Sequence, residues 1–396
     1  MRRYLEILRT PYVGRLFGAS LLARLPMGIN GLAIVLLLRA ETGSFAIAGA
    51  TAGALALGSG LGAPAAGRLI DTLGVRTLLV LAVVNAAGLL ALVWLARASA
   101  PAAVLVFTAL VAGGAFPPTS SVLRTRYPIL FARQPHLMQG AFALDSVLTE
   151  SIFTVAPLLT AALVVLFDPA AALLLSAATV VGGTAAMVAA LPPGEQPQEE
   201  PRRGRLGALA SPGIRTLVWT MLPVGFAFGT LEVALPAFAD GEGRPELAGV
   251  LLALLAVGSV AGGLIYGARP RRGSLAGAHL RMAVGFPLSM LPLAFASSPV
   301  VMALLVLPAG SMIAPLIATR NELAGAVAPA GAQTEAYTWP LTALVTGLAL
   351  GAGAAGALAD AVSWQAAVVA GVAAAAAGAA ISAIRRATLT PAPARP

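Results

Sequence analysis

Residues 55–76, LALGSGLGAPAAGRLIDTLGVR, decide the fold, because this stretch joins a small-residue helix to a charged turn and partly recurs later in the chain. Its opening pattern returns at residues 255–267 as LAVGSVAGGLIYG, 200 positions further on. Other pairs keep nearly the same offset, including Ala112-Gly113 with Ala309-Gly310 and Pro118 with Pro315. Chance identities would not stay in register, so the pattern predicts two homologous halves in the same order.

The composition places these halves in a lipid bilayer. The chain of 396 residues is 58% hydrophobic and 10% charged, with a mean hydropathy of +0.88, which leaves too little polar surface for a soluble globule. The absence of cysteine excludes disulfides, thiolate metal sites and cysteine nucleophiles, and two histidines are too few for a metal cluster. In a soluble protein a net charge of +9 would suggest binding to nucleic acid. In a membrane protein the basic residues instead indicate which loops face the cytoplasm, so we expect no nucleic-acid partner.

Twelve apolar runs are long enough to cross the hydrocarbon core, which needs about 20 residues per helix. We expect an N-terminal six-helix bundle within residues 1–191, a cytoplasmic linker at 192–213 and a C-terminal six-helix bundle within 214–396. The linker is rich in proline, glycine and charge. The predicted spans cover residues 12–38, 45–69, 77–96, 101–123, 138–167, 170–191, 214–238, 247–268, 275–296, 300–319, 334–358 and 364–384.

The arginines predict the orientation. With both termini in the cytoplasm, the outer loops hold only Arg39, Arg97 and Arg244, whereas the inner loops and tails collect fifteen arginines, as the positive-inside rule requires. The basic first residues carry no small-residue cleavage site, so we expect them to be retained. An even number of spans per half also gives the two halves one orientation, which is the parallel-repeat plan.

Small residues recur in these spans at helical spacing. Gly-x-x-x-Gly pairs let helix backbones approach closely where lipid removes the hydrophobic driving force. Two interpretations stay open: static packing within a half, or smooth surfaces along which the halves rock. The pairs begin at Gly49, Gly58, Gly258, Gly263 and Gly347.

The turn at residues 67–76, GRLIDTLGVR, resembles the signature loop of the major facilitator superfamily: a glycine, three residues, an acid, two residues and a second glycine. A degenerate second copy stands at residues 267–272, and Thr72 and Val75 replace the family's usual basic residues. The resemblance implies an all-α membrane protein with twelve transmembrane helices in two pseudo-symmetric bundles. It further implies a transporter, not an enzyme, in a bacterial plasma (inner) membrane.

In that family the loop latches the two halves when the cytoplasmic side is closed. Gly67 and Gly74 permit a tight turn and close helix contact. Asp71 can accept hydrogen bonds from the positive end of a neighbouring helix or pair with an arginine. Topology makes Arg124 and Arg126 the nearest arginines, and we expect these residues, with Arg76, to form the cytoplasmic gate.

Four charged residues lie inside the predicted spans: Arg24, Asp145, Glu150 and Glu232. Each costs on the order of 3 kcal/mol at a helix centre unless a partner or water compensates, and the resemblance places all four at or near the substrate and proton path. Asp145 and Glu150 are separated by about 140° around a helix. One of them could therefore pair with Arg24 while the other faces a cavity.

The roles of these four residues stay open between function and structure. Arg24 either binds an anionic group or tunes a carboxylate, or it forms a structural ion pair. Glu150 is the preferred proton site, with a structural salt bridge as the alternative, and Asp145 is the candidate gate acid. Glu232 lies toward the outer end of its span, where it can reach water, and we expect Asn321 and Glu322 to form a solvated helix end.

The resemblance implies alternating access driven by a proton gradient, with no bound cofactor. The chain has no lysine, and therefore no phosphate-binding loop for ATP. The expected activity is efflux of an amphiphilic or drug-like compound by a monomer in the bilayer. The alternatives are a nutrient or sugar importer and a non-transporting sensor or assembly partner. The family's exporters often carry an arginine where this chain has Ala109, and a glycine-rich motif where it keeps only Ala156-Pro157.

Overall fold

The computed structural model describes residues 2–191, 206–244, 247–271 and 273–390. Within these ranges twelve helical segments are long and apolar enough to cross a membrane, which confirms the predicted all-α, twelve-span fold. The predicted linker at 192–213 lies largely outside the described residues, and α11 begins inside it, at Pro212. The division into domains at 191 and 214 stays a proposal.

The first six spans are built from nine helices, α2 to α10, and the short helix α1 precedes them. Span 1 is split into α2 and α3, and span 4 into α6, α7 and α8, while the other four spans are continuous. The bounds are α1 (Arg2–Arg9), α2 (Val13–Arg24), α3 (Pro26–Thr42), α4 (Phe45–Leu73), α5 (Thr77–Arg97), α6 (Ala102–Gly114), α7 (Thr119–Thr125), α8 (Tyr127–Leu130), α9 (Met138–Leu166), preceded by the 3₁₀ turn η1 (Pro135–Leu137), and α10 (Pro169–Ala190).

The second six spans repeat the plan with a break in span 10. A 3₁₀ turn also ends span 9. The bounds are η2 (Gly207–Ala210), α11 (Pro212–Gly241), α12 (Leu247–Ala268), α13 (Leu275–Met290), η3 (Leu291–Phe295), α14 (Pro299–Ser311), α15 (Ile313–Ala326), α16 (Gln333–Ala361), α17 (Trp364–Ile384) and η4 (Arg386–Leu389).

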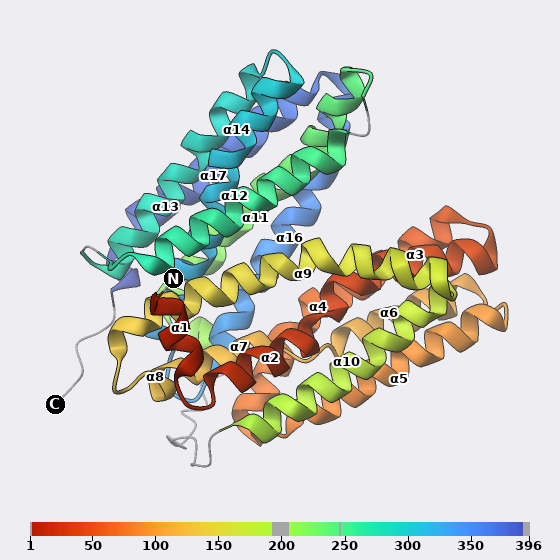
Figure 1. The fold of residues 1–396 in the computed structure, drawn as a ribbon, viewed down its shortest axis with the longest axis horizontal. Helices are drawn as coiled ribbons and strands as arrows, with labels where there is room; N and C mark the ends of the chain where they lie inside the picture. The colour runs from red at the N-terminus through yellow and green to blue at the C-terminus, as the bar shows by residue number, and fades with distance from the viewer. Residues whose placement is uncertain (1, 192–205, 245–246, 272, 391–396) are drawn as a thin grey trace.

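The two sets of helices form two bundles that converge at one end and diverge at the other (Figure 1). Helix α1, at the start of the described chain, lies at the converging end. The bundles meet along two crossings, α4 against α16 and α9 against α12. Each crossing pairs one helix from each half, so the repeat in sequence is also a repeat in space.

Prolines explain the breaks in spans 4 and 10. Proline has no backbone N–H and its ring clashes with the carbonyl four residues earlier, so a helix cannot continue through it undisturbed. Span 4 is interrupted between Gly114 and Thr119, at Pro117-Pro118, and span 10 at Met312, just before Pro315. In span 10 the helix resumes and runs to Ala326, seven residues beyond the predicted end at 319.

Glycine positions show how closely the duplicated helices pack. A Cβ added to Gly58 would overlap the backbone of Leu110, and one added to Gly258 would overlap the backbone of Leu307. These equivalent contacts join α4 to α6 in one half and α12 to α14 in the other. Gly347 meets α11 in the same way, through Leu222. At these positions the Gly-x-x-x-Gly pairs pack helices within a half, which is the static interpretation.

Candidate functional site

The converging end is held by a carboxylate placed at a helix N-terminus. Asp71, near the end of α4, accepts hydrogen bonds from the backbone N–H groups of Thr334 (3.0 Å) and Glu335 (2.9 Å) in the first turn of α16. These N–H groups have no partner inside their own helix, and the helix dipole favours a negative charge beside them. Of the two partners left open by the sequence, Asp71 therefore takes the helix end.

Glu335 extends this contact to η2, within the predicted linker. Its side chain is buried and accepts hydrogen bonds from Trp339 Nε1 (3.0 Å) and from the backbone N–H of Ala208 in η2 (3.1 Å). Arg68 Nε lies 3.5 Å from the same carboxylate. One acid therefore joins α16, α4 and the entry to the second half. We call Asp71, Glu335 and Arg68 the latch.

Glycine brings the two halves into backbone contact at both crossings. A Cβ on Gly67 would lie 3.0 Å from Glu335 Cα in α16, and a Cβ on Gly267 would lie 2.6 Å from Ala143 Cβ in α9. Gly67 and Gly267 occupy equivalent positions of the repeat. Unlike the glycines inside each half, this pair lies at the surface between the halves.

The second crossing uses the opposite hydrogen-bond polarity. Gln139, in the first turn of α9, donates from Nε2 to the carbonyls of Tyr266 (2.9 Å) and Arg269 (3.0 Å) at the end of α12. Tyr4 of α1 donates to the carbonyl of Leu264 (2.6 Å), and burial raises the pKa of Tyr4 to about 12, so it stays a donor. The degenerate second loop is therefore held by donors rather than by an acid.

The predicted gate arginines do not contact Asp71. Arg124 bonds Asp145 instead, Arg126 is buried at the end of α7, and Arg76 is exposed at the start of α5. Gly74 ends α4 with a φ of 91°, a left-handed backbone that glycine adopts without strain. Pairing of Asp71 with one of these arginines was therefore the wrong alternative. The N-terminus of α16, which is distant in sequence, supplies two backbone donors to the Asp71 carboxylate instead.

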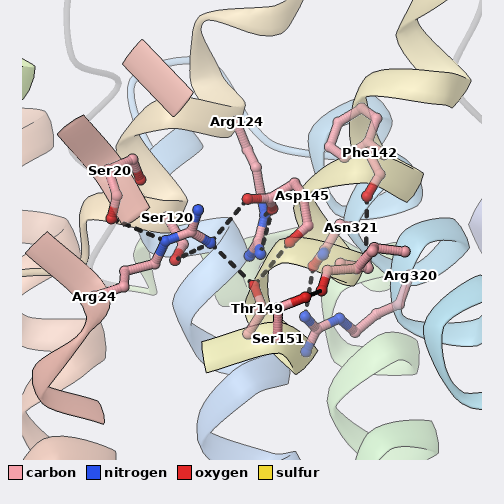
Figure 2. Close-up of polar contacts among 12 residues, drawn as sticks. Ser20, Arg24, Ser120, Arg124, Phe142, Asp145, Thr149, Ser151, Arg320 and Asn321 are labelled. Atoms are coloured by element: carbon pink, nitrogen blue, oxygen red, sulfur yellow. Dashed lines mark hydrogen bonds and ion pairs between the residues drawn. The ribbon is translucent and has the colours of Figure 1, made fainter. Parts of the chain in front are cut away.

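A buried ion cluster is formed around Asp145 (Figure 2). Asp145 of α9 is fully buried and binds Arg24 Nη1 at 2.8 Å and Arg124 Nη2 at 2.7 Å. Arg24 Nη1 also bonds Thr149 Oγ1 (3.0 Å) and Ser120 Oγ (3.3 Å). The sequence left open whether Asp145 or Glu150 pairs with Arg24, and in the structure Asp145 does.

Helix breaks position the two arginines. Arg24 is the last residue of α2, directly before the break at Leu25, and Arg124 lies in the short helix α7 beyond the span 4 break. At a helix C-terminus the dipole favours a cation. The breaks thus allow spans 1 and 4 to turn a guanidinium toward the same carboxylate on α9.

Arg320 of α15 joins this cluster from the second half, although it was not among the predicted site residues. Only 2% of Arg320 is exposed, its guanidinium points toward the α9 segment with Thr149 and Ser151 (Figure 2), and it interacts electrostatically with Arg124 and Asp145. The repeat register could have found it: the offset that relates Pro118 to Pro315 carries Arg124 to within one residue of Arg320.

The end predicted for span 10 was wrong. Asn321 is buried and accepts a hydrogen bond from Arg320 Nη2 (2.5 Å), and Glu322 pairs with Arg271. These contacts bind part of the polar groups of three consecutive residues, the helix runs on to Ala326, and the expected solvated end does not form at this point.

The other two predicted path residues, Glu150 and Glu232, come from opposite halves of the chain. Glu150 is half-buried near the middle of α9, and Glu232 is exposed on α11. The two carboxylates interact electrostatically, although they belong to different halves. Glu232 therefore does more than end its span in water, since it shares the environment of Glu150.

Comparisons with known proteins agree with this architecture. Residues 16–288 match the family model described as Major Facilitator Superfamily. Among the solved structures, a bacterial homologue of the iron transporter ferroportin in its outward-facing state aligns with a TM-score of 0.75 at 16% identity, covering 94% of this chain and 99% of that one.

Two further structures show the same fold. The human organic anion transporter MFSD10 (TETRAN) aligns with a TM-score of 0.67 at 18% identity, covering 95% of this chain and 98% of that chain. The E. coli fucose:proton symporter FucP aligns with a TM-score of 0.72 at 16% identity, covering 95% and 99%. No curated protein matches the sequence. At these identities the structural matches show the fold alone.

Proposed function

The chain belongs to the major facilitator superfamily, secondary transporters of small molecules, and from this premise we propose that it is a proton-coupled exporter of an amphiphilic compound. Glu150 and Glu232, two interacting carboxylates from opposite halves, carry the proposal. Two nearby acids in a poorly solvated space repel each other when both are ionised, so the pair favours holding a proton. Because one carboxylate lies in each half, the repulsion between them depends on the distance between the halves.

In the proposed transport cycle the two ends of the protein open in turn, which is alternating access. If both termini are cytoplasmic, as the arginine distribution predicts, the end closed by the latch faces the cytoplasm and the diverging end faces outward (Figure 1). Protonation of the Glu150–Glu232 pair removes its repulsion and lets the halves approach at the diverging end. Release of Asp71 from the N-terminus of α16 then opens the other end.

Export is the direction we propose, with an amphiphilic solute because the chain is 58% hydrophobic and only 10% charged. The direction is tested by substrate accumulation in cells with and without the protein. Export lowers accumulation. Raised accumulation would indicate an importer, and unchanged accumulation of every compound would indicate a non-transporting membrane protein.

Proton coupling is tested in proteoliposomes by measuring substrate flux against an imposed pH gradient. We expect Glu150→Gln to abolish the dependence on the gradient, because an amide cannot bind and release the proton. Glu242→Gln, at an exposed position just after α11, is the matched control and should retain the dependence. A gradient-dependent flux in the Glu150→Gln protein would contradict the assignment.

A further inference from the structure

The buried ion cluster has more positive than negative groups. Three arginines, Arg24, Arg124 and Arg320, surround one carboxylate, Asp145, which already bonds two of them. Arg320 interacts electrostatically with Arg124, which repels it, with Asp145 and with the buried His279. Burying an unbalanced guanidinium in a membrane protein is costly, so such a group is expected to serve a ligand.

Hydrogen-bond donors in the cluster are also left over. Within the described part of the chain, Arg320 Nε and Nη1, Arg24 Nη2 and Asn321 Nδ2 are buried and have no hydrogen-bond partner. Buried donors are normally satisfied, and a charged donor that is not costs more than a neutral one. The unused donors come from α2 in one half and from α15 in the other.

From this geometry we propose that the transported solute is an organic anion whose charged group is bound between Arg24 and Arg320, with Asn321 as a further donor. The inference rests on the proposed transport function and specifies its substrate class. Guanidinium groups match carboxylate, sulfonate and phosphate oxygens with paired hydrogen bonds. An anion there would offset part of the excess charge and bind the unused donors together.

The surroundings narrow the class to an amphiphilic anion with one charged group. Three guanidinium groups against the one carboxylate of Asp145 leave an excess of two positive charges, which accommodates a ligand with one anionic group. Ser120 and Thr149, both half-buried, already bond Arg24 on its less buried side. Because Arg24 and Arg320 belong to different halves, a bound anion would also link them, which ties substrate binding to their relative position.

The test uses three probes of similar size that differ in permanent charge: naphthalene-2-sulfonate, naphthalene-2-sulfonamide and a naphthylmethyl-trimethylammonium ion. Thermal shifts of the purified full-length protein measure binding, and flux into proteoliposomes measures transport. We expect the sulfonate to raise Tm saturably and the other two to have little effect. Arg320→Gln should weaken sulfonate binding at least tenfold, and Arg320→Lys should weaken it less.

The outcomes separate this inference from the proposed function. Equal or stronger stabilisation by the neutral or cationic probe would overturn the anion site, as would undiminished sulfonate binding by a folded Arg320→Gln protein. Proton-driven flux of the cationic probe alone would overturn the anion class and leave the transport function standing. Saturable sulfonate binding that depends on Arg320, without flux of any probe, would support the site and contradict transport.

Discussion

Asp145→Asn tests the buried ion cluster most sharply, because the change keeps the size of the side chain and removes only its charge. Asp145 is fully buried and neutralises Arg24 and Arg124 through contacts of 2.8 and 2.7 Å. Removing one partner of a buried ion pair costs about 3–5 kcal/mol, since the remaining charge stays desolvated. For a domain the size of one half of this chain, each kcal/mol lost lowers Tm by roughly 2 °C. The apparent Tm of Asp145→Asn should therefore fall by at least about 6 °C.

The matched control is Asp168→Asn. Asp168 also binds an arginine, Arg97, at 2.6 Å, but about half of each side chain is exposed, and such pairs contribute about 0–1 kcal/mol. Asparagine can still accept the N-cap hydrogen bond that Asp168 takes from Ala171, so the helix end is preserved. Thermal unfolding of the purified proteins in one detergent measures both variants.

A further substitution checks the cause of the loss. Adding Arg24→Gln to Asp145→Asn removes one of the unpaired charges, so the double variant should be more stable than the sum of the two single effects predicts. Equal Tm shifts for Asp145→Asn and Asp168→Asn, or strictly additive effects in the double variant, would refute the reasoning.

Two further predictions concern the contacts between the halves. Asp71→Asn should slow transport at unchanged membrane insertion, because the N-terminus of α16 loses a negative charge contributing about 0.5–2 kcal/mol; normal flux by a fully inserted variant would contradict the latch. Gly267→Val should lower Tm by overpacking against Ala143, at about 1–3 kcal/mol. Gly49→Val, at a glycine with no neighbouring atom within 4 Å, is its control and should be nearly neutral, and equal losses would show that Gly267 does not lie at a tight crossing.

Much of the fold follows from local and repeated features of the sequence. Hydrophobic length predicted all twelve spans, and the offset between residues 55–76 and 255–267 predicted equivalent helices that do make equivalent glycine contacts. Prolines marked the interruptions of spans 4 and 10. Each of these features depends on the residues of one span or on the repeat. They can therefore be predicted without knowing which residues meet in the folded protein.

The candidate site was less predictable because its partners are distant in sequence. Asp71 bonds residues 334 and 335, and topology alone favoured an arginine. Arg320 was missed because the run Arg-Asn-Glu resembles the polar end of a span. The tertiary pairing of Glu322 with Arg271 accompanies the continued helix, together with a local hydrogen bond from Arg320 to Asn321.

The central claim is that the two bundles exchange closure between their ends, and the cysteine-free chain permits a direct measurement. Spin labels at Glu41→Cys and Asp240→Cys report the diverging end, and labels at Arg76→Cys and Gln333→Cys report the latched end. Pulsed electron-spin distances in lipid, across a pH series with and without substrate, should show the first distance shortening as the second lengthens. Two distances that stay constant under every condition, or that change in the same direction, would contradict alternating access.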